Sequence, residues 1–546
     1  MRQAEPSAPF AGGLPPLIQA LQRPAPYPHR VGRVRLVQTH ISWVLLTGAF
    51  AYKIKKPVDL GFLDFSTLAR RRQACEEELR LNRRWAPDLY LDVVAVMGTP
   101  AAPRLGGDGA PFEYAVRMRQ FPQSGQLDRR LAAGALTTDE IEDFARRLTG
   151  VHAAAPVAPD GGPFGTAAAV RAPVEDTVAV LLARARDSAE AASLETIRRW
   201  TASQPGDEGL QARLRDGFVR EVHGDLHLAN LVRWRGQVHA FDCIEFDPAL
   251  RWIDVLSDVA FLMMDLAYRG RRDLAYAFLN RYLEVTGDYA GVRVLRYYRV
   301  YRALVRAKIA AIRRATRSAG VANGNGASVR AHLALAQAWT QPPSPALVLM
   351  HGFSGSGKTR LGDALATGLP AVRLRSDLER RRQSATAGRY GAAGRDATYA
   401  RLLELAEAVL AGGENAVIDA TFLSRGQRER FAALAARLGV PRLIVDCVAP
   451  RRVLERRIVR RARAGADASE ADLAVLAGQI ESAEPLTPAE RAGALELDTS
   501  RPVDATALAR VVRSRVAQPR RRRFPPRFRR RLAGRGPSAP NRPAAT

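Results

Sequence analysis

The sequence predicts two folded domains of different class, an α+β domain followed by an α/β domain built on a parallel sheet. The chain has 546 residues, well beyond the roughly 100–200 residues of one domain. In its second part, short apolar runs alternate with helical patterns, which is typical of parallel strands buried on both faces. In its first part, strand-like runs come before a long helical stretch, and a hairpin-like pair is followed mostly by helical sequence.

Breaks in composition place the domain boundaries. Residues 318–328 are rich in Gly, Ala, Ser and Asn, and a Pro-rich run follows shortly after them, as in linkers. We therefore expect one domain at residues 29–335, including a trailing linker, and a second at residues 345–516. Residues 1–28 lack the apolar core of a signal peptide and are expected to be a disordered lead. Residues 517–546 are expected to be a disordered basic tail.

The net charge of +28 is concentrated partly in this tail. No acidic residue follows Asp504, whereas arginines recur in blocks such as Arg520–Arg523 and Arg529–Arg531. One interpretation is a solvated tail without a partner. The other is a weak attraction to RNA or to an anionic membrane surface.

Two further observations concern the compartment. No run of roughly 18 or more apolar residues is present, so we expect no transmembrane segment. The three cysteines lie far apart and lack the spacing of metal ligands, as reduced thiols of a cytoplasmic protein do. We therefore expect a cytoplasmic protein.

The elements of each domain follow from local patterns. In the first domain we expect strands at residues 33–46 and 49–55, a helix at about residues 66–85, a hairpin joining residues 231–234 to residues 238–242, and mostly helix to about residue 317. Ser66 or Thr67 is a suitable cap for the first helix. In the second domain the expected strands include residues 346–350, 416–418 and 442–445.

A Gly-rich loop lies between the first strand of the second domain and a helical stretch. It has the spacing G-x4-G-K-T, and its candidate phosphate-binding residues are Gly352, Gly355, Ser356, Gly357, Lys358 and Thr359. Glycines let backbone amides curl round phosphate oxygens, and the helix N-terminus adds partial positive charge. Lys358 would reach the β- and γ-phosphates, and the Thr359 hydroxyl would bind Mg²⁺.

Three later features favour a kinase over a motor ATPase. Asp377 is a candidate base that would accept the proton of an acceptor hydroxyl, and Arg380 would neutralise the transferring phosphoryl group. Asp419, at another strand end, is a candidate metal ligand. Arg457 and Arg461 would lie on one face of an Arg-rich helix and close over the phosphates. The alternatives are a helix cap for Asp377, a turn residue for Asp419 and a solvated basic face for the arginines.

This second region resembles the small P-loop kinases of the gluconate kinase, polynucleotide kinase and zeta-toxin type. The resemblance covers about residues 345–500 and rests on the Gly-rich loop, on Asp377-x-x-Arg380 and on the Arg-rich helix. It implies phosphorylation of a hydroxyl on a sugar, a nucleotide or a polynucleotide end.

A second constellation, of the form H-x-D-x4-N, begins at His223. Asp225 is the candidate base, and Asn230 and Asp242 are candidate Mg²⁺ ligands, because kinase chemistry needs a carboxylate base and oxygen ligands for the metal. His223 would orient the loop. A zinc site that combines His223, His227 and Asp225 is the alternative.

A lysine and a glutamate upstream would position ATP. The chain has only five lysines, and three of them, Lys53, Lys55 and Lys56, lie in one strand-like run. We expect Lys53 to pair with Glu78, with Lys55 and the adjacent Glu76 and Glu77 as alternatives. Residues 114–118 are expected to form the hinge that pairs with adenine.

This region resembles the aminoglycoside phosphotransferase group of protein-kinase-like enzymes. The resemblance covers about residues 29–317 and includes Asp258, whose counterpart in that group is usually structural; the G-x-G-x-x-G loop of protein kinases is absent. The order of the two regions resembles the bacterial bifunctional "aminoglycoside phosphotransferase/ATP-binding" proteins. It implies a two-headed phosphotransferase that uses ATP and Mg²⁺ on a hydroxylated small molecule or nucleotide. The alternative is an ATP-sensing regulatory or RNA-associated protein with one weakly active module.

Overall fold

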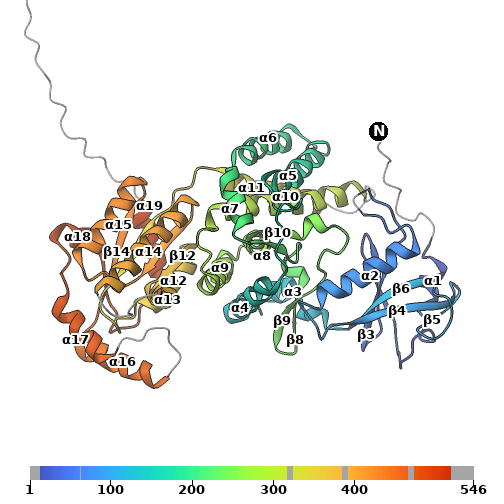
Figure 1. Cartoon of the computed structure of the whole chain (residues 1–546), viewed down its shortest axis with the longest axis horizontal. Coiled ribbons are helices and arrows are strands. Elements are labelled where there is room, and N and C mark those ends of the chain that lie inside the picture. The colour runs from blue at the N-terminus through green and yellow to red at the C-terminus, as the bar shows by residue number, and fades with distance from the viewer. Residues whose placement is uncertain (1–12, 62, 317–323, 384–391, 465–471, 518–546) are drawn as a thin grey trace, which may run out of the picture.

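A computed structural model describes residues 13–61, 63–316, 324–383, 392–464 and 472–517. The predicted basic tail lies outside the described residues from position 518 onward. Figure 1 shows three parts in a row, with a blue sheet at one end, green helices in the centre and an orange sheet at the other end. The predicted succession of an α+β domain and an α/β domain with a parallel sheet is confirmed.

The N-terminal lobe is a six-stranded antiparallel sheet with one long helix against it. Its strand order is β1-β2-β3-β6-β4-β5. The strands are β1 (Arg35–Gln38), β2 (Ser42–Leu46), β3 (Phe50–Lys55), β4 (Tyr90–Thr99), β5 (Ala102–Leu105) and β6 (Glu113–Arg119). Helix α2 (Leu68–Asn82) begins after Thr67, whose side chain accepts a hydrogen bond from the Arg70 amide.

Two expectations for this lobe are wrong. Residues 33–46 form two strands, because the Thr39 amide bonds the Ser42 carbonyl and turns the chain. The predicted disordered lead is ordered from residue 13: α1 (Pro16–Ala20) precedes Leu21, and Ile18 and Leu21 are fully buried against the sheet. Burial of these apolar side chains stabilises a segment whose composition indicated disorder.

The expected hinge at residues 114–118 is also wrong. These residues lie within β6, which pairs with β3 on one side and with β4 on the other. Their backbone groups are used by the sheet on both sides, so they are not available to adenine. The segment that leaves the sheet after Arg119 occupies the position between the two lobes instead.

The central lobe is mainly helical, with two short strand pairs. Its helices are α3 (Leu127–Ala132), α4 (Thr138–Ala154), α5 (Ala167–Leu182), α6 (Ser188–Ser203), α7 (Asp207–Arg215), α8 (Val255–Tyr268), α9 (Arg272–Thr286), α10 (Val292–Thr316) and α11 (Gly324–Thr340). Strand β7 (Val219–Glu221) pairs with β10 (Trp252–Asp254), and β8 (Leu231–Trp234) pairs with β9 (Gln237–Ala240). The predicted hairpin is confirmed, with positive φ angles at Arg235 and Gly236.

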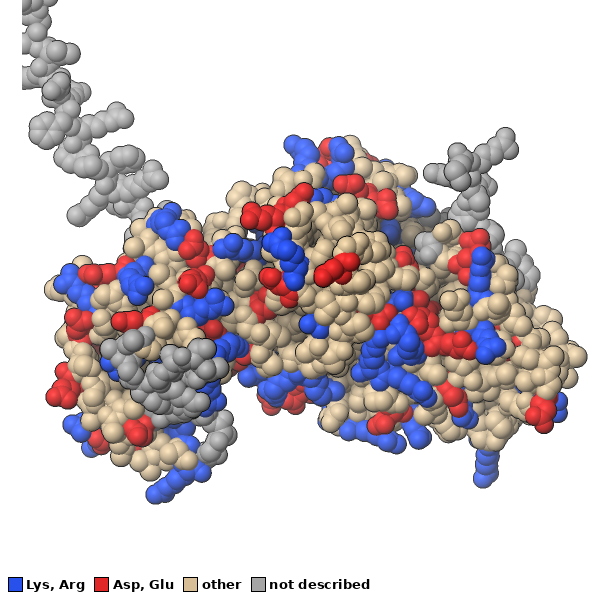
Figure 2. Space-filling view, viewed as in Figure 1, with Lys and Arg blue, Asp and Glu red and all other residues tan. Residues whose placement is uncertain are grey.

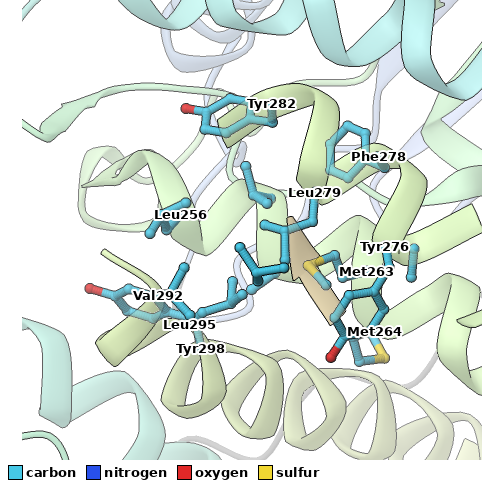
Figure 3. Packing of buried hydrophobic residues seen from close by; sticks show 14 of the residues in the cluster. Leu256, Met263, Met264, Tyr276, Phe278, Leu279, Tyr282, Val292, Leu295 and Tyr298 are labelled. Carbon is cyan, nitrogen blue, oxygen red and sulfur yellow. The ribbon is translucent and has the colours of Figure 1, made fainter. Parts of the chain in front are cut away.

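The core of this lobe lies between α8, α9 and α10. Figure 3 shows side chains of these three helices pointing toward one another, among them Met263 of α8, Leu279 of α9 and Leu295 of α10. Helix α11 packs on this core through Val329 and Leu333, so the predicted linker at residues 318–328 is helical from residue 324 onward.

The third part is a parallel five-stranded sheet flanked by helices. Its order is β12-β13-β11-β14-β15, and every pair is parallel. The strands are β11 (Leu347–His351), β12 (Ala371–Arg375), β13 (Asn415–Asp419), β14 (Arg442–Val448) and β15 (Leu495–Asp498). The helices are α12 (Lys358–Gly368), α13 (Ser376–Gln383), α14 (Ala392–Ala411), α15 (Arg425–Arg437), α16 (Arg451–Ala464), α17 (Leu473–Ser482), α18 (Pro488–Gly493) and α19 (Ala505–Ala517).

Helix α9 of the central lobe covers the edge strand β12 of the parallel sheet. The Asn280 side chain donates to the Ala371 carbonyl (2.9 Å) and accepts from the Arg373 amide (2.7 Å). Beside it, the Arg373 guanidinium pairs with Glu284 of α9 at 2.6 Å, and all four side chains are buried. Leu279 belongs to one continuous apolar cluster with residues of β12 and β13. The two domains therefore share a core.

Charge is dispersed over the face of the molecule that Figure 2 shows. Figure 2 shows basic and acidic side chains interspersed on the face in view, with no large area of one sign. No helix within the described residues is long and apolar enough to cross a membrane.

Candidate active sites

The first site is built on the loop between β7 and β8, which carries His223 to Asn230. The Asp258 carboxylate at the start of α8 accepts hydrogen bonds from the amides of His223 (2.8 Å) and Gly224 (2.9 Å). Gly224 has a φ of +81°, and a Cβ there would lie 2.6 Å from the Leu250 carbonyl oxygen. A buried acid and a glycine therefore fix the backbone just before Asp225.

Asp225 and Asn230 face each other across this loop. The Asn230 amide nitrogen donates to the Asp225 carboxylate (2.9 Å) and to its carbonyl (3.0 Å), which leaves the amide oxygen for another partner. Burial alone would raise the pKa of Asp225, but the charge and hydrogen bond of His227, with Arg306 nearby, hold it well below its usual range. The Asp225 side chain is about one-third exposed, at 34%. The low pKa favours an ionised carboxylate, and part of this side chain is exposed.

Asp242 follows the β8–β9 hairpin in a strained backbone conformation. Its φ is +63°, in the left-handed region that aspartate tolerates better than most residues. The Asp242 amide donates to the Tyr90 hydroxyl, and the next amide, of Cys243, donates to the Asn82 side chain. Burial would raise the pKa of Asp242, but the ammonium group of Lys53 lowers it. The carboxylate is 45% exposed and pairs with Lys53.

Both candidate lysines of β3 reach the same glutamate of α2. Lys53 Nζ lies 2.7 Å from one carboxylate oxygen of Glu78, and Lys55 Nζ lies 2.5 Å from the other. The alternatives Glu76 and Glu77 point elsewhere: Glu76 pairs with Arg72 at the surface, and Glu77 pairs with Arg80 and Arg251. Strand alternation explains why the two lysines share a face.

These residues fit an ATP–Mg²⁺ complex. Asn230 and Asp242 offer the oxygen ligands that Mg²⁺ prefers, and Lys53 offers an ammonium group beside them. The zinc alternative lacks support, because no group of three or more His, Cys, Asp and Glu side chains among the described residues is arranged to hold a metal ion.

The second site lies where β11 leads into α12. Gly352, Gly355 and Gly357 all have positive φ angles. A Cβ on Gly352 would lie 2.4 Å from the Cys447 carbonyl oxygen, and one on Gly355 would lie 2.8 Å from the Leu454 carbonyl oxygen. Glycine is therefore required here by both conformation and space, as in a loop whose amides surround phosphate.

Lys358 at the start of α12 folds back over this loop. Its ammonium group donates to the Phe353 carbonyl (2.7 Å) and lies 3.4 Å from the Ser356 hydroxyl. Burial lowers the pKa of Lys358, and the nearby Asp419 opposes this effect. Burial likewise raises the pKa of Asp419, against the charges of Arg373 and Lys358. Thr359 is exposed at the surface of α12.

Asp377 and Asp419 lie at the carboxyl ends of neighbouring strands of the sheet. Asp419 ends β13 opposite Arg375 of β12, and Asp377 lies two residues further on, in α13. The Arg375 guanidinium pairs with Asp377 (2.7 Å); burial would raise the pKa of Asp377, but this pairing lowers it. Arg380 lies one turn along α13, close to Tyr399.

Arg457 and Arg461 both lie on α16, which is the predicted Arg-rich helix, and Arg457 contacts the Gly-rich loop. Arg457 donates to the Gly355 carbonyl (3.2 Å) and to Thr499, so it connects α16 to the loop and to the residue that follows β15. The charge of Arg461 acts on Lys358 and lowers the pKa of that lysine. Sequence reasoning missed Thr499, which also donates to the Ser356 carbonyl (2.8 Å), because it lies far along the chain.

Sequence reasoning also missed Glu245 and Arg251 in the first site. Glu245 is buried and pairs with Lys55, and Arg251 donates to the Glu245 carbonyl (3.1 Å) and to Glu77. The sequence did contain a signal for Glu245: it is an acidic residue three positions after Asp242, and Lys55 is a second lysine near Lys53 in a chain with few lysines.

The fold and the two sites define a protein-kinase-like domain joined to a P-loop domain. The AAA domain family matches residues 347–486. Over 455 residues, the chain is 30% identical to the uncharacterized protein Rv2004c of Mycobacterium tuberculosis (strain ATCC 25618 / H37Rv), covering 81% of this chain and 89% of that protein. The chain belongs to the same family as this mycobacterial protein.

Two solved structures are each similar to one part of the chain. A gluconokinase from Sinorhizobium meliloti 1021 is 22% identical, covers 32% of this chain and 92% of its own, and gives a TM-score of 0.24. A choline/ethanolamine kinase family protein from Mesorhizobium loti is 13% identical, covers 57% of this chain and 89% of its own, and gives a TM-score of 0.36.

Proposed function

We propose that this protein is a bifunctional phosphotransferase with two ATP–Mg²⁺ sites, each of which transfers the γ-phosphoryl group of ATP to a hydroxyl. The observation that carries the proposal is the grouping of Asp225, Asn230 and Asp242 with the Lys53–Glu78 pair. An ionised base, two metal ligands and a phosphate-binding ammonium group are the parts that phosphoryl transfer needs.

In the kinase-like site, Asp225 orients the acceptor hydroxyl and takes its proton. The acceptor oxygen forms a bond to the γ-phosphorus, the bond to the β–γ bridging oxygen breaks, and ADP leaves. Asn230 and Asp242 would hold Mg²⁺, which would neutralise charge on the phosphates when bound. Lys53, positioned by Glu78, leaves Asp242 and binds the phosphates.

In the P-loop site, the backbone amides from Gly352 to Lys358 hold the β- and γ-phosphates. Lys358 would turn from the Phe353 carbonyl to the phosphates, and Thr359 and Asp419 would hold Mg²⁺. Asp377 is the candidate base. Arg380 and Arg461 would stabilise the transferring group, and Arg457 would hold the arginine-rich helix beside the loop.

The test is a phosphoryl-transfer screen of the full-length protein against sugars, nucleosides, aminoglycosides and 5′-hydroxyl RNA. We expect Asp225→Asn to lower one activity by about 10²–10⁴-fold and Lys358→Ala to lower a different one by about 10²–10³-fold. Chelation of Mg²⁺ should abolish both. Lys56→Ala, at a lysine outside both sites, is the control.

Loss of both activities from either single substitution would contradict two independent sites. A wild-type protein that neither binds ATP nor transfers phosphate to any acceptor class would contradict the function itself.

A further inference from the structure

The kinase-like site contains a chain of alternating charges that is longer than one Lys–Glu pair. Asp242 pairs with Lys53, Lys53 with Glu78, Glu78 with Lys55, and Lys55 with Glu245. The carboxylate of Glu78 on α2 is thus shared by two lysines of β3. The last member of this series of ion pairs, Glu245, lies three residues after the first member, Asp242. The segment that carries the candidate metal ligand is therefore attached to β3 at both of its ends.

Lys55 differs from Lys53 in what it can reach. The Lys55 side chain is 0% exposed, and both of its carboxylate partners are buried with it. Its ammonium group also lies 5.4 Å from the centre of the Phe65 ring. Lys55 is enclosed by its own chain and has no path to a phosphate, so it is not a second ATP-binding lysine.

The Asp242 segment needs anchors, because its backbone is strained. A non-glycine residue in the left-handed region persists only where the surrounding structure determines its conformation. The amide of Ile244 donates to the His223 carbonyl (3.2 Å), and Arg251 binds the Glu245 carbonyl. Lys55 adds a charged anchor to the Glu245 side chain.

We infer that Lys55 and Glu245 are positioning residues of the kinase-like site. They hold residues 242–245 against β3 and α2, so that the Asp242 carboxylate faces the Lys53–Glu78 pair before any nucleotide binds. The inference rests on the proposed function of that site. A buried ion pair of this kind is not required for stability as such, since apolar replacement of both partners is often tolerated.

The experiment uses full-length protein that carries Lys358→Ala, which silences the P-loop site. ATP affinity is measured with MgCl₂ and with EDTA for this background and for Lys55→Met and Glu245→Gln. We expect the gain in affinity that Mg²⁺ gives to fall by about tenfold or more in both variants, as for partners that orient metal ligands. ATP affinity in EDTA should stay close to that of the background.

A second readout needs no ligand. Hydrogen exchange of the peptide that covers residues 241–246 should become faster in both variants. The amides of Cys243 and Ile244 are hydrogen-bonded, and these bonds should open more often when Glu245 is no longer held by Lys55. Lys56→Met is the matched control: this lysine is adjacent in sequence but donates to the Thr39 carbonyl, away from the charge chain. It should change neither readout.

The double variant Lys55→Met/Glu245→Met distinguishes a role in positioning Asp242 from a role in stability. It also tests the inference if one of the single variants does not fold. We expect resistance to urea to return in the double variant while the Mg²⁺-dependent gain in ATP affinity stays low. Return of that gain, or an unchanged gain in both single variants, would overturn the inference. If the Lys358→Ala protein itself bound no ATP, the proposed function of the kinase-like site would be wrong. The inference, which rests on that function, would then fail as well.

Discussion

At the scale of single residues, Glu221 shows how strongly arginines shape the kinase-like domain. Its buried carboxylate on β7 pairs with Arg80 of α2, with Arg84 just after this helix, and with Arg251. Burial would raise the pKa of Glu221, but these arginines lower it from 4.5 to about 2. One carboxylate thus joins α2 to the segment that follows Asp242.

This shift predicts a pH dependence of stability. Because the folded-state pKa is depressed, the contribution of Glu221 is fully present above pH 4.5 and is lost as the pH falls toward 2. We expect Glu221→Gln to cost on the order of 3 kcal/mol of unfolding free energy at pH 7 and progressively less in acid. Urea denaturation at pH 7, 5 and 3.5 measures this difference.

The control for this prediction is Glu76→Gln, on α2, the helix that carries Arg80, one of the partners of Glu221. Glu76 pairs with Arg72 at the surface, and such exposed pairs contribute at most about 1 kcal/mol. A destabilisation by Glu221→Gln that stays constant from pH 7 to pH 3.5 would contradict the ion-pair explanation.

At the scale of elements, α9 protects the edge of the parallel sheet. Asn280→Ala would leave the Ala371 carbonyl and the Arg373 amide buried without partners. A buried unsatisfied group costs about 1–3 kcal/mol, so we expect a loss of about 2–4 kcal/mol in urea denaturation. Val285→Ala, at a half-exposed position of the same helix, should change stability by no more than about 0.5 kcal/mol. Equal effects of the two substitutions would show that the edge contact contributes nothing.

Elements were predictable from the sequence where the signal is local. The phosphate loop, the H-x-D-x4-N loop and the β8–β9 hairpin each carry their pattern within a few residues, and the structure has these motifs on the expected elements. That residues 13–28 are ordered could not be predicted locally, because this depends on their burial against a sheet whose strands lie further along the chain. The same holds for Glu245 and Asn280, whose partners lie many positions away.

At the scale of the whole molecule, the charge of the C-terminal tail makes a separate prediction. Ten arginines follow Pro519. If the tail binds RNA, ending the chain at Pro519 should weaken binding and flatten its salt dependence, by about 0.7 in logarithmic slope for each arginine that pairs with a single-strand phosphate. A full-length chain with glutamine in place of these arginines is the control, and it should match the shortened chain. An unchanged slope in both would exclude this role.

The cover that α9 places over β12 also bears on the order in which the protein forms. Synthesis runs from the N-terminus, and domains generally fold as units while the chain emerges. Helix α9 and Asn280 therefore leave the ribosome before β12 does. When β12 joins the parallel sheet, Asn280 presents a donor and an acceptor to its outer edge. We therefore expect the P-loop domain to complete its fold against α9.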